Sequence, residues 1–282
     1  MRFSYLFTFL LVLCVFLLND TFAQYYYRDI WTNQQVNKEF ALLKSQGIRV
    51  ISLKSFEADG SESEGFFAEK KIDKNYLRSE MNSKSNVTEE SILVTYYNSE
   101  GKVTRTIDST SSTSSHTDYK YDEKGRLKKV FFYSRADIDS SAIGEEHEYF
   151  YNVAGALERM TKKKMNADYS TVTFKLDEKG NVTEEEEVIK GQGNKKYYYY
   201  YDDNNRLTDV VHFNERLGKL IPDFAYQYNE QGLADWLTST KEGTSDYVIW
   251  RYHYNENRLR DIEKLFSKDK KIIGTIEYQY IK

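Results

Sequence analysis

The sequence predicts an all-β protein in which repeated antiparallel β-hairpins form one long curled meander sheet. The first observation is a unit that recurs seven times: an aromatic pair, an Asp or Asn, then usually a Gly and a Leu or Val. The second observation is the period of 24 to 30 residues between the turn residues Asn98, Asp122, Asn152, Asp177, Asp202, Asn229 and Asn255. Such a period indicates stacked copies of one supersecondary unit, each too small to fold alone.

Residues 1–23 have the layout of a secretory signal peptide. Arg2 supplies a positive charge, residues 3–18 are nearly all apolar, and Ala23 is a small residue at a plausible cleavage point. An uncleaved anchor is the alternative, but this apolar run is short for a spanning helix, which needs roughly 20 residues. We therefore expect an exported protein whose mature chain begins at Gln24. That chain contains no cysteine, so its core rather than disulfides must hold it together.

Residues 24–90 are expected to form an N-terminal cap made of a helix and a strand. The helix candidate is residues 32–46, where apolar residues recur at spacings of four and three and Gly47 is a natural C-terminal stop. Residues 49–53 resemble a strand, and residues 71–77 resemble a first repeat without its glycine. Terminal units of repeat arrays are usually atypical because they cap the stack.

Residues 91–282 are expected to form the hairpin array, and each unit is interpreted as strand, tight turn, strand. The Asp or Asn can accept hydrogen bonds from backbone N–H groups two residues on, and the Gly that follows suits a left-handed turn position. After the turn, apolar residues recur at i and i+3, as at Leu127 and Val130, where a regular strand would show i and i+2. We therefore predict a β-bulge after each turn. The turn at Asn255 looks one residue shorter, so we expect its geometry to differ, with Leu259 and Ile262 as the apolar pair.

The two aromatic residues of each pair are two positions apart, so they share one face of the sheet. The residue between them is strongly polar in five of the seven pairs that run from Tyr119/Tyr121 to Tyr278/Tyr280. One face is therefore an aromatic core and the other is mainly solvated. About seven hairpins give roughly 14 strands, which is too many for a flat open sheet, so the sheet must curl with its aromatic face inward.

These units resemble the YD repeats of the RHS/YD-repeat family, whose signature is Tyr-Asp followed by Gly-Arg-Leu. Residues 121–127 match this signature fully, and residues 201–207 match it except for Asn205 at the glycine position. The resemblance covers roughly residues 90–282. It implies β-hairpins coiled into a continuous sheet, on bacterial secreted and surface proteins whose long arrays enclose or display a toxin domain. The array here reaches Lys282 and is short, so the resemblance implies fold and compartment rather than toxicity.

No group of residues in the sequence has the spacing of a catalytic or metal site, and no glycine-rich loop indicates a cofactor. The histidines at positions 116, 147, 212 and 253 lack metal-ligand spacing, and we expect them in solvent or on strand faces. The acidic run Glu184–Glu187 is interpreted as solvated strand residues facing Lys-rich neighbours such as Lys162–Lys164. A net charge of −4 with interspersed Lys and Glu argues against nucleic-acid binding.

Three aromatic residues are candidate binding residues because alternation places them on the polar face: Phe150, Tyr198 and Tyr200. Exposed aromatic rings can stack on sugars or anchor a protein partner. The insertion at residues 134–140, in the longest repeat, is a second candidate contact region.

The sequence thus predicts a non-catalytic exported repeat protein of the periplasm, cell surface or extracellular space, acting as a binding or structural module with a protein or glycan partner. It predicts no cofactor, no bound metal and no transmembrane segment in the mature chain. The alternatives are a carbohydrate-binding or carbohydrate-active protein, and an accessory or immunity partner of a toxin.

Overall fold

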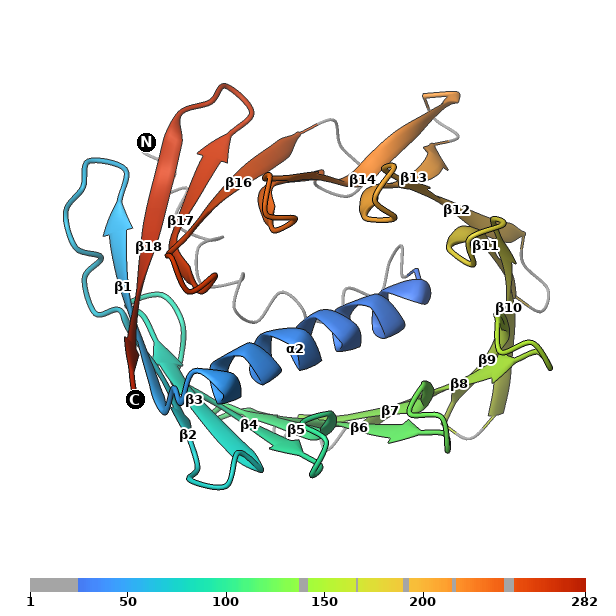
Figure 1. Cartoon of the computed structure of the whole chain (residues 1–282), viewed down its shortest axis with the longest axis horizontal. Helices are drawn as coiled ribbons and strands as arrows, with labels where there is room; N and C mark the ends of the chain where they lie inside the picture. Colours follow the sequence, from blue (N-terminus) through green and yellow to red (C-terminus); the bar gives the residue numbers. More distant parts are fainter. Residues whose placement is uncertain (1–24, 137–141, 166, 190–192, 215–216, 241–245) are drawn as a thin grey trace.

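The computed structural model describes residues 25–282, except residues 137–141, 166, 190–192, 215–216 and 241–245. The predicted signal peptide and most of the 134–140 insertion therefore lie outside the described residues. Within them the chain forms one helix followed by strands that pair in chain order (Figure 1). The elements are α2 (Tyr27–Ser45), β1 (Val50–Glu57), β2 (Phe67–Ile72), β3 (Arg78–Lys84), β4 (Ser91–Tyr97), β5 (Val103–Ser109), β6 (Thr113–Tyr121), β7 (Leu127–Ala136), β8 (Ala142–Tyr151), β9 (Leu157–Lys164), β10 (Ala167–Leu176), β11 (Val182–Ile189), β12 (Asn194–Tyr201), β13 (Leu207–Asn214), β14 (Lys219–Tyr228), β15 (Ala234–Thr240), β16 (Tyr247–Tyr254), β17 (Arg260–Ser267) and β18 (Ile272–Ile281).

The sheet is a closed antiparallel barrel of 18 strands, so the predicted open, curled meander is wrong. Closure comes from β1, which pairs with β2 on one side and with β18 on the other, where Val50 lies opposite Ile281. An open sheet would leave two edges with unpaired N–H and C=O groups, and closure removes both edges. The sequence pattern indicated curvature, but it carried no signal for the partner of the last strand.

The N-terminal helix was predicted to cap the end of the array. It lies inside the ring of strands instead (Figure 1). Strands β1, β2 and β3, which were expected to belong to the cap, are full members of the barrel wall. The helix ends as predicted: Gly47 has a φ of +74°, and Ile48 N–H donates to the carbonyl of Leu43 at 3.0 Å. This is a Schellman-type stop, in which a left-handed glycine lets the chain turn away from the helix.

The predicted turn and bulge recur in all seven units. In the unit of Asp122, Gly125 N–H donates to the Asp122 carbonyl at 2.9 Å with a φ of +73°, and Asp122 Oδ1 accepts from the N–H groups of Lys124 and Arg126. The strand register then shifts by one residue after every such turn, which confirms the predicted bulges. The degenerate first unit also turns, with Tyr76 in the left-handed conformation at a φ of +56°.

The expectation of a different turn at Asn255 is wrong. Arg258 takes the left-handed position with a φ of +63°, and Asn255 N–H donates to the Leu259 carbonyl at 2.9 Å, as in the other units. The equivalents of the apolar pair Leu127/Val130 are therefore Arg260 and Glu263, because Tyr254 pairs with Arg260 as Tyr121 pairs with Leu127. One copy of the repeat thus carries an Arg–Glu pair on its inner face.

Most neighbouring units are joined by the second residue of the aromatic pair, where it is a tyrosine. In six units its hydroxyl donates to the carbonyl of the first strand residue of the preceding unit, over 2.6 to 2.9 Å: Tyr121 to Val103, Tyr151 to Leu127, Tyr201 to Val182, Tyr228 to Leu207, Tyr254 to Ala234 and Tyr280 to Arg260. The Arg of the Gly-Arg-Leu motif reaches the other way: the Arg126 guanidinium lies 4.0 Å from the ring centre of the next tyrosine, Tyr151. These contacts explain why Tyr and Arg recur together in the motif.

The inward-facing aromatic residues form two clusters, one at each half of α2, as alternation predicts. Around the N-terminal half, Tyr25, Tyr26 and Ile30 pack against β7 to β14. Around the C-terminal half, Phe40 stacks on Tyr97 with ring centres 3.4 Å apart. The helix therefore supplies side chains to both parts of the barrel core.

Candidate functional site

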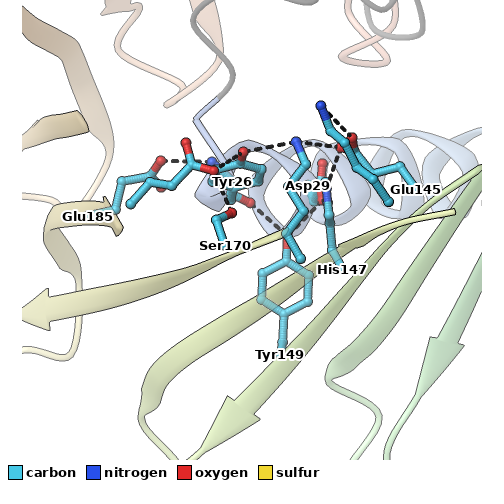
Figure 2. A network of polar contacts seen from close by, with 10 residues as sticks. Tyr26, Asp29, Glu145, His147, Tyr149, Ser170 and Glu185 are labelled. Carbon is cyan, nitrogen blue, oxygen red and sulfur yellow. Dashed lines mark hydrogen bonds and ion pairs between the residues drawn. The ribbon is translucent and has the colours of Figure 1, made fainter. Parts of the chain in front are cut away.

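The start of α2 is held against the inner wall of the barrel by a cluster of buried polar side chains (Figure 2). The cluster joins Tyr26 and Asp29 of the helix region to residues of five consecutive strands, β8 to β12. The wall residues are Glu145, His147, Tyr149, Lys162, Ser170, Glu185, Glu187 and Tyr199. We name this set the tether cluster.

Glu185 binds the backbone at the start of the helix. Its Oε1 accepts from Tyr26 N–H at 2.8 Å, and its Oε2 accepts from Tyr27 N–H at 2.9 Å and from the Tyr199 hydroxyl at 2.7 Å. The first N–H groups of a helix lack partners within the helix and carry partial positive charge, so a carboxylate here acts as a remote N-cap. Burial nevertheless raises the pKa of Glu185 to about 7, against these three hydrogen bonds.

His147 lies between two carboxylates. Its Nδ1 is 2.6 Å from Asp29 Oδ2, and its Nε2 is 2.8 Å from Glu145 Oε1. Burial alone would lower the pKa of His147, but Asp29 and Glu145 raise it to about 9. Burial would likewise raise the pKa of Glu145, but His147 and Lys162 lower it to about 2. The His147 side chain is therefore an imidazolium that holds the first turn of α2 to β8.

Lys162 and the Tyr26 hydroxyl complete the cluster. The Lys162 ammonium is 2.9 Å from Glu145 and donates to the Tyr26 hydroxyl at 3.0 Å, while burial lowers its pKa. The Tyr26 hydroxyl donates in turn to Glu187 Oε1 at 2.7 Å. The same oxygen of Glu187 also accepts from the Ser170 hydroxyl at 2.6 Å. Each polar group of the chain is thus bonded to the next, which is the condition for a buried network to stabilise a fold.

The side chains of the tether cluster hold the start of α2 to the barrel wall. Its two cations, His147 and Lys162, pair with the carboxylates of Asp29 and Glu145. The other two carboxylates, Glu185 and Glu187, accept hydrogen bonds from other protein groups. A nucleophile or a general base needs a free lone pair directed at substrate. The carboxylates of the cluster direct their lone pairs at the start of α2 or at other side chains of the wall instead. Among the described residues, no group of three or more His, Cys, Asp or Glu side chains could hold a metal ion.

The three predicted binding residues all lie on the outer wall, but the fold does not bring them together. Tyr198 and Tyr200 share the outer face of β12, where Tyr200 is 48% exposed, while Tyr197 and Tyr199 are buried as alternation predicts. Phe150 is four strands away on β8, about 19 Å at the usual strand spacing. The Arg159 guanidinium covers its ring at 3.7 Å.

Much of the outer wall carries ion pairs between neighbouring strands. Lys175 and Lys196 flank Glu184 at 2.9 and 3.3 Å. An open hollow of about 440 Å³ over β4 to β6 is lined by Tyr96, Thr104, Arg105, Ile107 and Asp118. Its two charged residues bond each other, with Arg105 Nη2 donating to Asp118 Oδ2 at 2.8 Å. This polar wall is the solvated face that the alternation predicts.

The acidic run was only half correctly interpreted. Glu184 and Glu186 are on the outer face with lysine partners, but Glu185 and Glu187 are buried on the inner face at 1% and 4% exposure. His147, expected in solvent or on a strand face, lies on the inner face of β8 and is buried. The position of Glu185 within the repeat could have predicted that its side chain faces inward. Glu185 is eight residues after its turn Asp, where other units have Val130, Met160, Val210 or Leu237, all of which are inward-facing.

Glu263 occupies the same position in the last complete unit and forms a second buried polar group. One oxygen, Oε1, accepts from the Tyr278 hydroxyl at 2.6 Å and pairs with Arg260 Nη1. The Arg260 guanidinium lies 4.3 Å from the centre of the Tyr252 ring. The other carboxylate oxygen, Oε2, and Arg260 Nε are buried, and neither has a hydrogen-bond partner. This Arg–Glu pair therefore has an unused donor and an unused acceptor.

No protein family and no curated protein matches this sequence. Among solved structures, a TcdB2-TccC3-Cdc42 complex is similar with a TM-score of 0.33 and 12% identity over 75% of this chain, which spans only 13% of that chain. A porin-like protein from Bacteroides uniformis has a TM-score of 0.38 and 12% identity, with 83% of this chain and 96% of that chain covered. One from Bacteroides vulgatus has a TM-score of 0.31 and 11% identity, with 83% and 98% covered. Similarities at these TM-scores carry no argument about function.

The described residues include no helix that is long and apolar enough to cross a membrane.

Proposed function

We propose that the chain is a non-catalytic exported protein of the bacterial cell envelope or surface, a short relative of the YD-repeat proteins that acts as a structural and binding module. The observation that supports it most directly is the tether cluster. Its buried titratable side chains, of the kinds that catalysis uses, are bonded to α2 or to one another. The export part of the proposal rests on the signal-peptide layout of residues 1–23.

The barrel suits such a role because it is a rigid scaffold. Each strand has two hydrogen-bonded neighbours, and tyrosine hydroxyls join most units to the preceding one. The helix inside adds side chains to both core clusters. A wall of this kind holds exposed side chains in fixed positions, which lowers the entropy that binding would otherwise cost.

Carbohydrate binding is a second candidate, favoured by the outer face of β12. Tyr200 is 48% exposed there, and Tyr198 is two residues away on the same face. Both rings can stack on the apolar face of a sugar.

Two experiments test the proposal. The intact mass of the protein from envelope fractions should correspond to a chain that begins at Gln24, and a cytosolic chain that retains residues 1–23 would contradict export. Affinity capture from envelope extract and a glycan array should then compare the mature chain with the double variant Tyr198→Ala/Tyr200→Ala. A matched control is Thr173→Ala, on the exposed face of β10. If the double variant folds and still captures every partner of the unmodified chain, the β12 face is not the contact surface.

A further inference from the structure

We propose that the hollow over β4 to β6, on the outer wall, binds a hexose ring of an uncharged glycan. The proposal rests on the binding-module function proposed above and places a binding site outside the β12 face. The hollow has a volume of about 440 Å³, within the range of roughly 300–1,000 Å³ that is usual for small-molecule sites. In this site the sugar stacks on the ring of Tyr96, and its hydroxyl groups bond to Arg105 and Asp118.

The strand register brings these three side chains into one row on the outer face. Tyr96 of β4 lies opposite Arg105 of β5, which lies opposite Asp118 of β6. Neighbouring strands are about 4.8 Å apart, so the row spans about 10 Å. Thr104 is the extra residue of the β-bulge in β5, and it lines the hollow together with Arg105, the residue that follows it. The barrel wall therefore holds an aromatic ring, a cation and a carboxylate at fixed spacing.

The equivalent row in another unit contains an aromatic ring that is covered. Phe150 and Arg159 are a cross-strand pair of β8 and β9, next to the bulge. They occupy the positions that Tyr96 and Arg105 have in their own unit. The Arg159 guanidinium lies 3.7 Å from the centre of the Phe150 ring. On the next strand Arg159 faces Thr173, which has no charge to attract it. The guanidinium therefore lies over the ring, where a sugar would have to stack.

At Tyr96 a carboxylate on the third strand keeps the ring open. Arg105 Nη2 donates to Asp118 Oδ2 at 2.8 Å, and Arg105 Nε donates to the other oxygen of Asp118. This bidentate contact holds the guanidinium on the side of β6. Tyr96 is accordingly 37% exposed. The two rows thus differ on the third strand, where one has Asp118 and the other has Thr173.

The charges around Tyr96 cancel, which favours a neutral ligand. Tyr96 lies between Arg105 and its partner on β3, Arg78. The two arginines pair with Asp118 and Glu80. An anion would meet two carboxylates and a cation would meet two guanidinium groups, so neither gains net attraction.

Hydroxyl groups suit the Arg105–Asp118 pair because each hydroxyl both donates and accepts hydrogen bonds. The guanidinium has further N–H groups beyond the two that bond Asp118, and each oxygen of Asp118 has a further lone pair. The side chains of Arg105 and Asp118 are 49% and 25% exposed. The pair therefore presents donors and acceptors side by side at the surface, as neighbouring hydroxyl groups of a sugar require.

The ring of Tyr96 offers too little apolar surface for a stable protein interface. At 37% exposure it presents less than about 100 Å², since a whole aromatic side chain has roughly 150–250 Å². An interface with a second copy of the chain would need about 800 Å² from each partner. A purely apolar ligand would remove Arg105 and Asp118 from water without replacing their hydrogen bonds to it. A hexose meets both conditions, because it is small and has an apolar ring face and a polar edge.

The test is a glycan array probed with the mature chain and with four variants. The array carries uncharged hexose oligosaccharides and, for comparison, oligosaccharides of uronic acids. Tyr96→Ala removes the ring, Tyr96→Phe keeps it, and Asp118→Asn removes the charge that holds Arg105 away from it. The matched control is Gln227→Ala, because Gln227 is exposed at the same position of its own repeat.

We expect the mature chain, Tyr96→Phe and Gln227→Ala to bind uncharged hexose chains with affinities within about twofold of one another. Tyr96→Ala should bind them about tenfold or more weakly, because the stacked ring is lost. Asp118→Asn should show a similar loss, because Arg105 is then free to cover the ring as Arg159 does in its own unit. If Tyr96→Ala does not fold, as judged by circular dichroism, Asp118→Asn decides, since asparagine keeps the shape of the side chain.

Three results would overturn the proposal: no binding to any uncharged glycan, stronger binding to the uronic acids, or equal affinity in the mature chain and Tyr96→Ala. A loss in Tyr198→Ala/Tyr200→Ala without a loss in Tyr96→Ala would also overturn it, and would support the β12 face instead. Export is tested separately by the intact mass, so a failure of the hollow and a failure of the proposed function give different results.

Discussion

Two glutamates occupy the same position in two copies of one repeat, yet their surroundings differ. Glu185 and Glu263 each lie eight residues after the turn residue, face inward and are 1% exposed. Glu185 accepts three hydrogen bonds through both oxygens, two of them from the backbone at the start of α2. Glu263 is bonded through one oxygen only. The repeat therefore decides where a side chain points, and the segment that lies opposite decides what it binds.

The largest effect on stability should come from Glu185→Val. Valine is the residue that two other copies of the repeat have at the equivalent position. Valine fits the inner face but leaves two backbone N–H groups and the Tyr199 hydroxyl without an acceptor. We expect unfolding to become easier by about 4 kcal/mol, since each buried unsatisfied group costs about 1–3 kcal/mol. Urea titration followed by circular dichroism measures this.

The matched control is Glu186→Val, on the outer face of β11, which should change the free energy of unfolding by under about 0.5 kcal/mol. Equal losses at Glu185 and Glu186 would mean that the tether cluster does not anchor the helix.

The second effect concerns pH and the charged side of the tether cluster. The folded pKa of His147 is raised to about 9, above the ordinary 6.5, so the folded state retains its proton between these values. Stability from this group is fully present below pH 6.5 and is lost as the pH rises through 9. The shift corresponds to a loss on the order of 3 kcal/mol. Glu145, with a pKa lowered to about 2, acts in the opposite sense, since its contribution is lost as the pH falls toward that value.

Urea titrations at several pH values between 6 and 9 should show this loss in the unmodified chain and a much smaller one in His147→Gln. His253→Gln is the control, because the His253 side chain is 69% exposed. A pH dependence that survives unchanged in His147→Gln would assign it to another group.

A smaller effect is expected at the turns, which all units share. Gly125→Val should cost roughly 1–2 kcal/mol, because a β-branched residue is strained at positive φ and Gly125 has a φ of +73°. A Cβ there would also lie 2.2 Å from Lys102 Nζ, so this side chain must move. Asn205→Gly should be neutral or slightly stabilising, since Asn205 already adopts a φ of +60°. Thermal unfolding measures both, and unchanged melting temperatures in both variants would contradict the turn assignment.

The smallest effect should come from returning the second glutamate unit to the apolar pair of other copies. Arg260→Leu/Glu263→Val removes both members of a buried ion pair together, which is often neutral or stabilising. The Tyr278 hydroxyl loses its acceptor, so we expect a stability within about 1 kcal/mol of the unmodified chain. A loss as large as that of Glu185→Val would show that the two glutamates have the same structural role. The single variant Glu263→Val should be less stable than the double variant, because it leaves Arg260 without its partner.

Local structure was well predicted from the sequence because it depends on short-range rules. The left-handed Gly125, the turn begun by Asp122 and the bulge between Leu127 and Val130 each follow from residue types within one unit. Strand alternation correctly separated Tyr199 from Tyr200. The misaligned unit at Asn255 shows the limit of apolar spacing, since its Arg260 and Glu263 break the pattern although its backbone does not.

The sequence by itself determined the repeat, its turns and the two faces of the sheet, because these depend on neighbours within a few residues and on the two-residue period of a strand. Only the tertiary structure decided that the sheet closes and that the helix lies inside it. Closure depends on Val50 meeting Ile281 at the far end of the chain. The roles of His147 and Glu185 depend on Asp29 and on the backbone of Tyr26, each more than a hundred residues away in the sequence. Contacts over such distances leave no local pattern, because they are selected by the geometry of the closed barrel.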